Sequence, residues 1–207
     1  MYDLLLMLYE FLCETIPFLL ALSIYRHVQT EKGRIISVSD STMLIVLALY
    51  VIGVFHFTGA GTIYTAVTLG LNFDNVNLIP FSDFGFSFRG YLLNAVMFIP
   101  FGFLLPFLFP EKRKWTTVIA AGFWFSLLIE LSQLISFRAT DVDDLIMNTL
   151  GAAIGYIFYL VIVKCANVKG KSLPKSGLPC VIFSIFLARF CLYAELIMGH
   201  LIYELLY

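Results

Sequence analysis

Long apolar runs constrain this chain more than any other feature of its sequence. They lie near residues 4–25, 42–57, 91–109, 115–137, 145–164 and 178–205. About 20 mostly apolar residues in a helix cross the hydrocarbon core of a bilayer. The pattern therefore predicts an all-α, polytopic membrane protein with about six transmembrane helices, which cannot fold as a soluble globular domain. The second run is the least sharply bounded and is expected to extend, after Gly59 and Gly61, toward Leu71.

The composition agrees with this class. Hydrophobic residues make up 60% of the chain and charged residues 13%, whereas soluble domains carry roughly a quarter charged residues. The first run follows Asp3 and contains Glu10 and Glu14, without a basic segment before it. These features favour a retained first span over a cleaved signal peptide.

The cysteines indicate neither a disulfide framework nor a zinc site. Cys13, Cys165, Cys180 and Cys191 form no CxxC pair, and none has a nearby histidine in the sequence. We interpret them as inert thiols, and the sequence predicts no cofactor and no metal site. The net charge of −1 indicates no particular partner, and nothing in the pattern points to nucleic acid.

The distribution of Lys and Arg predicts the orientation of the spans. From the amino terminus through the five loops to the carboxyl terminus, the basic residues number 0, 3, 1, 3, 1, 4 and 0. Loops rich in Lys and Arg remain in the cytoplasm. We therefore predict a multi-pass protein of the bacterial plasma membrane with both termini, loop two and loop four outside.

Polar residues concentrate in outer loops two and four and at the ends of the adjoining spans. The candidate ligand-binding residues there are Asn77, Arg89, Asn94, Glu130, Gln133, Arg138, Asp141, Asp144 and Asn148. The alternative is a purely structural role, in which the asparagines and aspartates are turn formers, helix caps and solvated loop charges. The functional interpretation is an outward-facing polar pocket between spans three, four and five.

Glu130 is the strongest of these candidates because it lies inside an apolar run. It shares a helix face with Gln133, and a helix that continued to Phe137 would place it roughly 10 Å below the outer end. An ionised carboxylate at that depth is costly unless it is paired or hydrated. We therefore expect Glu130 to form an ion pair, with Arg89 favoured over Arg138 as the partner.

The fifth run predicts a helix with two kinds of surface. Asp141, Asp144 and Asn148 are expected on one stripe, which continues inward as Gly151, Ala152 and Gly155. Small residues spaced four apart allow helices to approach closely. In the last run, Arg189 is expected to pair with Glu195 or with Glu10 or Glu14 of the first run, in a structural role.

Several motifs together resemble one known family. They are Asn77-Leu-Ile-Pro-Phe81, the stretch from Asn94 to Pro106, Glu130-Leu-Ser-Gln133, Arg138-Ala-Thr-Asp-Val-Asp-Asp144 and Asn148-Thr-Leu-Gly151. Their order and spacing are similar to those of the VanZ-like family. The resemblance divides the chain into a first span with its loop (1–41), a VanZ-like domain (42–164) and a last loop and span (165–207).

The resemblance implies a cell-envelope protein and a link to antibiotic resistance. The founding member of the family confers low-level resistance to teicoplanin, a lipoglycopeptide. We expect the pocket to bind a polar head group, either of a membrane lipid, of a lipid-linked cell-wall precursor, or of the lipoglycopeptide itself. Arg89 and Arg138 would contact phosphate.

Two other classes of function remain open. A membrane enzyme would use Glu130, Asp141 and Asp144 to hold a divalent cation against a lipid phosphate or pyrophosphate. The sequence contains no repeated DxxD pair and no nucleophile motif to support it, so a non-enzymatic protein is favoured. A flippase ranks third, because no inverted repeat is visible.

The predicted orientation has a direct test. An impermeant thiol reagent applied to intact cells should label Asp83→Cys in outer loop two and should not label Ser172→Cys in the fifth loop. The opposite labelling pattern would overturn the orientation.

Overall fold

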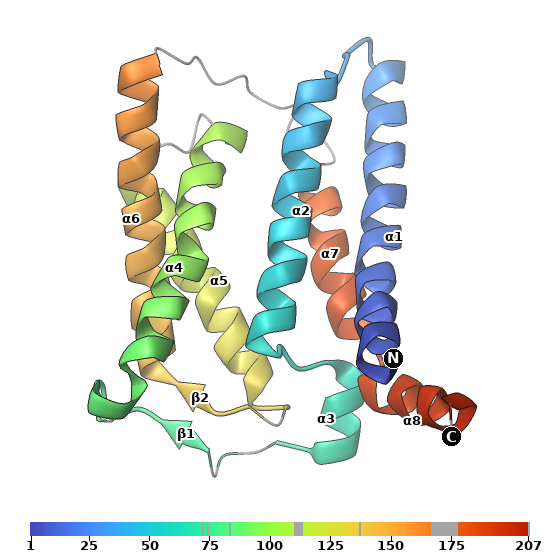
Figure 1. Cartoon of the computed structure of the whole chain (residues 1–207). Helices are drawn as coiled ribbons and strands as arrows, with labels where there is room; N and C mark the ends of the chain where they lie inside the picture. Colours follow the sequence, from blue (N-terminus) through green and yellow to red (C-terminus); the bar gives the residue numbers. More distant parts are fainter. Residues whose placement is uncertain are drawn as a thin grey trace. The chain divides into compact units, whose positions relative to one another are not determined.

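The protein is described by a computed structural model covering residues 1–71, 73, 75–82, 84–109, 114–136, 138–166 and 178–206; for residues 84–87, 166, 178–179 and 196 only the backbone is described. Within these ranges the elements, in chain order, are α1 (Tyr2–Glu31), α2 (Val38–Thr58), α3 (Ile63–Leu69), β1 (Val76–Asn77), α4 (Phe84–Leu108), α5 (Trp115–Gln133), β2 (Thr140–Asp141), α6 (Val142–Ala166), α7 (Leu178–Leu192) and α8 (Glu195–Leu206) (Figure 1).

The prediction of an all-α polytopic fold is confirmed. In the described part of the chain, five helical stretches are long and apolar enough to cross a membrane: Tyr2–Glu31, Val38–Leu69, Phe88–Leu108, Trp115–Gln133 and Val142–Cys165. A sixth span is formed if α7 and α8 are counted as one broken span.

The last predicted span is not one continuous helix. The chain bends by 63° between Cys180–Leu192 and Ile197–Leu206. Tyr193 and Ala194 lie between α7 and α8 and are buried. A hydrophobic run alone does not reveal such a bend, because both halves are apolar.

The second apolar run, predicted near residues 42–57, is also broken. The break lies at Gly59 to Gly61, where the sequence bounds the run least sharply. The helix α2 begins with a capping box, in which Asp40 N–H donates to Ser37 Oγ at 3.1 Å. It ends at Gly59, whose φ of 62° lies in the left-handed region that glycine adopts without strain. The short helix α3 then begins with a second capping box, between Thr62 and Thr65.

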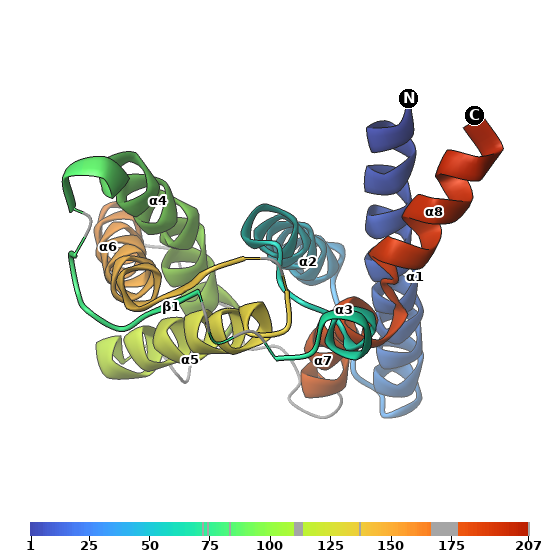
Figure 2. The same cartoon turned by 90° about the horizontal axis from the view of Figure 1, so that it is seen from below.

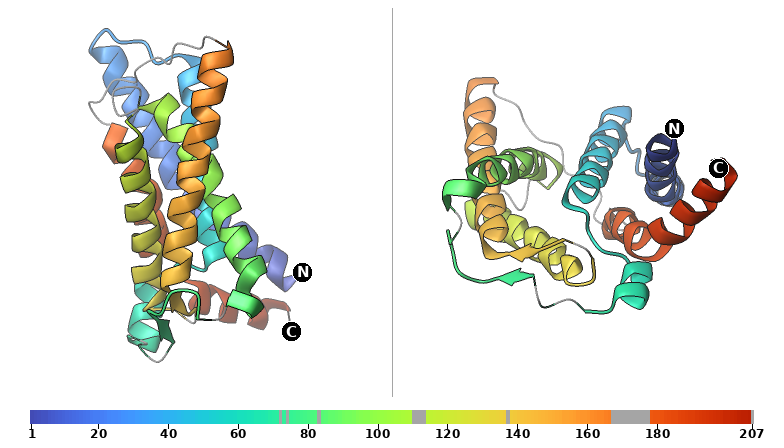
Figure 3. Two further views of the ribbon diagram at one scale, coloured as in Figure 1. Left: turned by 90° about the vertical axis from the view of Figure 1, so that its left-hand side faces the viewer. Right: turned by 60° about the horizontal axis from the view of Figure 1, so that its bottom comes forward.

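The chain forms two compact units. Unit 1 comprises Met1–Asn72 and Pro174–Tyr207, and unit 2 comprises Phe73–Leu173. In unit 1, α1 packs against α2, α7 and α8, and Figure 2 shows α8 beside the amino-terminal part of α1. In unit 2, α6 packs along both α4 and α5 (Figure 3). The division at residues 41/42 and 164/165 stays a prediction.

Some residues used in the orientation argument lie outside the described residues. They are Lys112, Arg113, Lys169, Lys171 and Lys175 of the basic loops, together with the labelling positions Asp83 and Ser172. Among the native cysteines, Cys165, Cys180 and Cys191 are exposed and Cys13 is half-buried. The labelling experiment therefore requires a background in which these four are replaced by serine.

Small residues set the distance between α4 and α6. A methyl group added at Gly151 would lie 2.0 Å from the carbonyl oxygen of Ala95, and one added at Gly155 would lie 2.0 Å from that of Ile99. On α4, the same addition at Gly102 would lie 1.9 Å from the carbonyl oxygen of Ala152. The two backbones therefore touch directly, which confirms the close approach predicted for Gly151 and Gly155.

Aromatic side chains fill the other side of α4, against α5. The ring centroids of Phe98, Phe101 and Phe125 lie 5.3 to 6.0 Å from one another. Phe98 is completely buried. Such a cluster excludes lipid from the centre of unit 2 and fixes the angle of α5 relative to α4.

The glycine contact predicts a sharp difference between two positions on α4. Gly102→Ala should destabilise the protein by roughly 1–3 kcal/mol, because the new methyl group must push α6 away. Gly90→Ala is the matched control, since an added methyl group there meets nothing within 4 Å. Thermal unfolding of the purified variants in detergent measures both effects. Equal stability of the two variants would contradict the direct backbone contact.

Candidate functional site

Two short strands bring together the loops that the sequence singled out. The strands β1 and β2 pair in parallel, with Val76 opposite Thr140 and Asn77 opposite Asp141. Thr140 N–H also donates to the carbonyl of Asn75 at 3.0 Å. The strands lie at the end of unit 2 where α5 ends and where α4 and α6 begin (Figure 1). Residues more than 60 positions apart therefore meet at one end of the bundle.

Asn77 and Asp141 are joined by their side chains as well as by the strand register. Asn77 Nδ2 lies 3.3 and 3.4 Å from the two carboxylate oxygens of Asp141 and donates to Ser82 Oγ at 3.0 Å. Asp141 Oδ1 in turn accepts the backbone N–H of Asp143 at 2.9 Å. Asp141 therefore caps the amino terminus of α6. This is the structural role that the sequence analysis gives as the alternative to ligand binding.

Asp143 is the residue that the sequence interpretation missed. It is completely buried, and its carboxylate accepts the backbone N–H of Phe81 at 2.8 Å and the hydroxyl of Tyr91 at 2.6 Å. Phe81 itself has a φ of 58°, which is rare outside glycine, so Asp143 holds a tight turn in loop two. The available signal was Tyr91 at the start of an apolar run, where a buried hydroxyl needs an acceptor.

Glu130 is buried, as predicted, but its partner is different. Its Oε2 accepts the backbone N–H of Asp141 at 3.0 Å, and its own carbonyl accepts the hydroxyl of Thr140 at 3.3 Å. Arg89 and Arg138 are both exposed, and neither forms an ion pair with it among the described residues. The predicted Glu130–arginine pair is therefore wrong.

The helix boundary explains this difference. We expected α5 to continue to Phe137, but the helix ends at Gln133. Glu130 is thus only three residues from the last helical residue, about 4.5 Å along the axis. At that position the chain turns into β2, and a peptide N–H reaches the carboxylate without help from an arginine. Gln133, on the same face, is also buried.

The polar stripe on α6 is divided between two neighbouring helices. Asp144 accepts a hydrogen bond from Asn94 of α4. Asn148, one turn further along α6, donates from Nδ2 to Ser126 Oγ of α5 at 2.9 Å. Asn148 is 1% exposed, and its Oδ1 has no hydrogen-bond partner among the described residues. Asp141 does not belong to this helical stripe, because it lies in β2, before α6 begins.

We call the set of Asn77, Tyr91, Asn94, Glu130, Asp141, Asp143 and Asp144 the strand-end network. Its four carboxylates accept hydrogen bonds from peptide groups, amides and a hydroxyl. Among the described residues, no Lys, Arg or His forms an ion pair with any of them. The same part of the chain shows no group of three His, Cys, Asp or Glu side chains placed to hold a metal ion.

The chemistry of this end is therefore rich in acceptors at its centre and basic at its rim. The carboxyl groups accept hydrogen bonds from neutral donors, while Arg89 and Arg138 are exposed and form no ion pair with them among the described residues. The two exposed guanidinium groups at this end can bind an anion.

The fold and this site define a polytopic α-helical membrane protein with a polar network at one end of a three-helix unit. A sequence model of the VanZ/LLP1 family matches residues 41–163. The chain belongs to the VanZ/LLP1 family. It is 37% identical over 99 residues to Protein VanZ of Enterococcus faecium, a match that covers 46% of this chain and 58% of that protein. No solved structure matches the chain significantly.

The strand-end network predicts that Asp143 is a structural anchor of loop two. Asp143→Ala should remove the carboxylate that accepts from the hydroxyl of Tyr91 and the N–H of Phe81, at a cost of roughly 1–3 kcal/mol for each lost hydrogen bond. Tyr91→Phe removes only one of these bonds and should cost less. A double-mutant cycle by unfolding in detergent measures the coupling between the two residues. Additive effects would contradict the contact.

Proposed function

We propose that this chain is a bacterial plasma-membrane protein that contributes to resistance against lipoglycopeptide antibiotics of the teicoplanin type. The family match over residues 41–163 is the observation that carries this proposal. The match to VanZ of Enterococcus faecium spans 58% of that protein. The role of that relative therefore comes to this chain as a proposal and not as a finding.

We further propose that the strand-end network forms the floor of an outward-facing pocket for a polar head group. The acceptors would meet hydroxyl, amide or ammonium donors of the ligand, and Arg89 and Arg138 would contact a phosphate or carboxylate. The Oδ1 of Asn148, which has no hydrogen-bond partner in the described part of the chain, supports the idea of a ligand or water donor between α5 and α6. In the predicted orientation, loops two and four lie outside, so this end of unit 2 would face the cell wall.

The carboxyl group of Glu130 gives a direct test of this function. Glu130→Gln keeps an oxygen that can accept the N–H of Asp141, so the fold should be retained while the carboxyl group is lost. Glu204→Gln, in α8, is the matched control because its side chain is exposed and lies outside the network. Each version is expressed in a teicoplanin-susceptible Gram-positive host, and membrane levels are compared first.

We expect the unmodified chain and Glu204→Gln to raise the minimum inhibitory concentration of teicoplanin. Glu130→Gln should return it to the level of the host. Full protection by a correctly inserted Glu130→Gln variant would refute the role of this site, and no protection by the unmodified chain would refute the proposed function itself. Titration of the purified protein with teicoplanin or with a polyprenyl phosphate distinguishes the two kinds of head group.

A further inference from the structure

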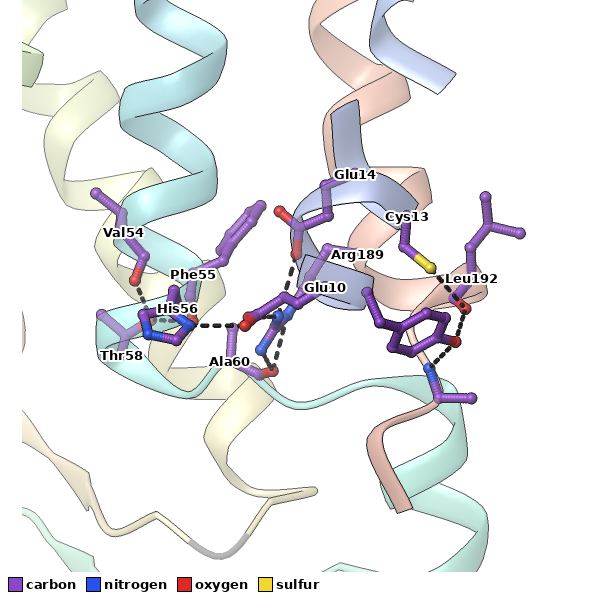
Figure 4. A network of polar contacts seen from close by, with 12 residues as sticks. Glu10, Cys13, Glu14, Val54, Phe55, His56, Thr58, Ala60, Arg189 and Leu192 are labelled. Atoms are coloured by element: carbon purple, nitrogen blue, oxygen red, sulfur yellow. Dashed lines mark hydrogen bonds and ion pairs between the residues drawn. The ribbon is translucent and has the colours of Figure 1, made fainter. Parts of the chain in front are cut away.

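Unit 1 contains a second set of buried charges, far from the strand-end network in the sequence. We call Glu10 and Glu14 of α1, His56 of α2 and Arg189 of α7 the unit 1 cluster (Figure 4). Glu10, Glu14 and Arg189 are 6%, 0% and 3% exposed. These three residues lie outside the segment that matches the VanZ/LLP1 family. The cluster is therefore not explained by the proposed function.

Arg189 is the centre of this cluster. Its Nη1 binds a carboxylate oxygen of Glu10 and one of Glu14, the latter at 3.1 Å. Its Nε and Nη2 donate to the carbonyl of Ala60 at 3.2 and 2.9 Å. That carbonyl is available because α2 ends at Gly59. Of the partners expected from the sequence, the structure thus selects the two acids of α1, whereas Glu195 is exposed.

The charges of the cluster do not balance through Arg189 alone. Two carboxylates contribute −2 and one guanidinium contributes +1, which leaves −1 with a neutral His56. The guanidinium cannot lose its proton in a protein. An uncompensated charge inside an apolar helical bundle is costly, and a buried acid takes up a proton instead. One proton beyond that of Arg189 therefore neutralises the cluster.

The groups that face the cluster do not supply another cation. Tyr193 places its ring 4.6 Å from the guanidinium carbon of Arg189, and Tyr9 is bonded to the backbone at Leu192 and Ala194. On α8, His200 pairs with Glu204 in an exposed contact of 3.2 Å. Among the described residues, Arg189 and His56 are thus the cationic side chains that contact Glu10 or Glu14.

Glu14 and His56 occupy the two ends of this cluster and differ in their exposure. Glu14 Oε1 accepts from Arg189, but Oε2 is buried and has no hydrogen-bond partner among the described residues. His56 Nδ1 lies 2.6 Å from Glu10 Oε2, and the side chain of His56 is 40% exposed. A charged, unpartnered oxygen at Glu14 is much less favourable than a neutral carboxyl group.

We propose that the unit 1 cluster is a proton-binding site, in which Glu14 holds one exchangeable proton that enters through His56. His56 Nε2 takes a proton from hydronium, which leaves water, while Nδ1 passes its own proton to Glu10 Oε2, and that proton is redistributed between the two carboxylates that share Arg189. No other bond forms or breaks. In the loaded state, Arg189 balances Glu10, and Glu14 and His56 are neutral. Loss of the proton leaves a net charge of −1 inside the bundle.

Infrared spectroscopy of the full-length protein in lipid nanodiscs tests this proposal directly. A pH titration should show the carbonyl band of one protonated carboxylic acid that disappears as the pH rises. Glu14→Gln should remove this band, and His56→Gln should shift its midpoint or slow its exchange. His200→Gln and Glu204→Gln are the matched controls from the exposed pair and should change neither property.

The pH dependence of the folding stability is a second measurement, and the proposal fixes the sign of its change. Near neutral pH the folded protein would hold a proton that an unfolded glutamate has released, so stability should fall as the pH rises through the titration. The unfolding equilibrium of the unmodified protein should change by about tenfold per pH unit in that window. Glu14→Gln should remove the pH dependence of the unfolding equilibrium. In that variant the charges of Glu10 and Arg189 balance without an added proton.

The outcomes distinguish the proposal from a static ion pair. A carboxyl band that vanishes in Glu14→Gln, with a midpoint that moves in His56→Gln, supports the site. The absence of a titrating carboxyl band in the unmodified protein overturns it. If Glu14→Gln does not fold, the partly exposed His56→Gln decides: an unchanged midpoint and exchange rate overturn the proposal.

Discussion

The direct contact between the backbones of α4 and α6 is the constraint on which unit 2 depends. Glycine at positions 102, 151 and 155 removes the side chains that would otherwise hold the two helices apart. The separation is then set by the peptide groups themselves. Only at this distance do the acids at the start of α6 reach the first turns of α4, where Asp143 meets Tyr91 and Asp144 meets Asn94. The packing inside the bundle thus determines the geometry of its polar end.

The two units satisfy their buried acids in different ways. In unit 2, the carboxyl groups accept hydrogen bonds from peptide N–H groups, two side-chain amides and a hydroxyl, all of which are neutral donors. In unit 1, Arg189 is shared by two acids. Neutral donors orient a carboxyl group without adding a positive charge, whereas a guanidinium balances one negative charge. The two units therefore differ in whether a cationic side chain lies beside their buried acids.

The family segment contributes to both units. It begins at residue 41 and ends at residue 163, so it includes α2 and α3 of unit 1 as well as the helices of unit 2. The break after α2 exposes the carbonyl of Ala60 to Arg189, which lies beyond the segment. The flanking helices α1 and α7 therefore complete contacts that the family segment leaves open.

Much of the fold and part of the site could be predicted from the sequence by itself. Apolar runs determine membrane helices, because a bilayer requires about 20 apolar residues and an internally hydrogen-bonded backbone. Small residues four positions apart indicated the close helix contact, and buried polar residues indicated where loops two and four meet. These are properties of composition and spacing, which do not depend on the neighbours of a residue in space.

The tertiary structure alone decided which groups bind each acid. A run of apolar residues cannot show that α5 ends at Gln133 or that the last span is bent, since helical and turning segments there are equally apolar. Glu130 therefore seemed to need an arginine, but a peptide N–H from β2 reaches it. Asp143 likewise depends on a turn at Phe81, 62 residues earlier. Hydrogen bonds are short and directional, so their partners are settled only when the chain has brought distant residues together.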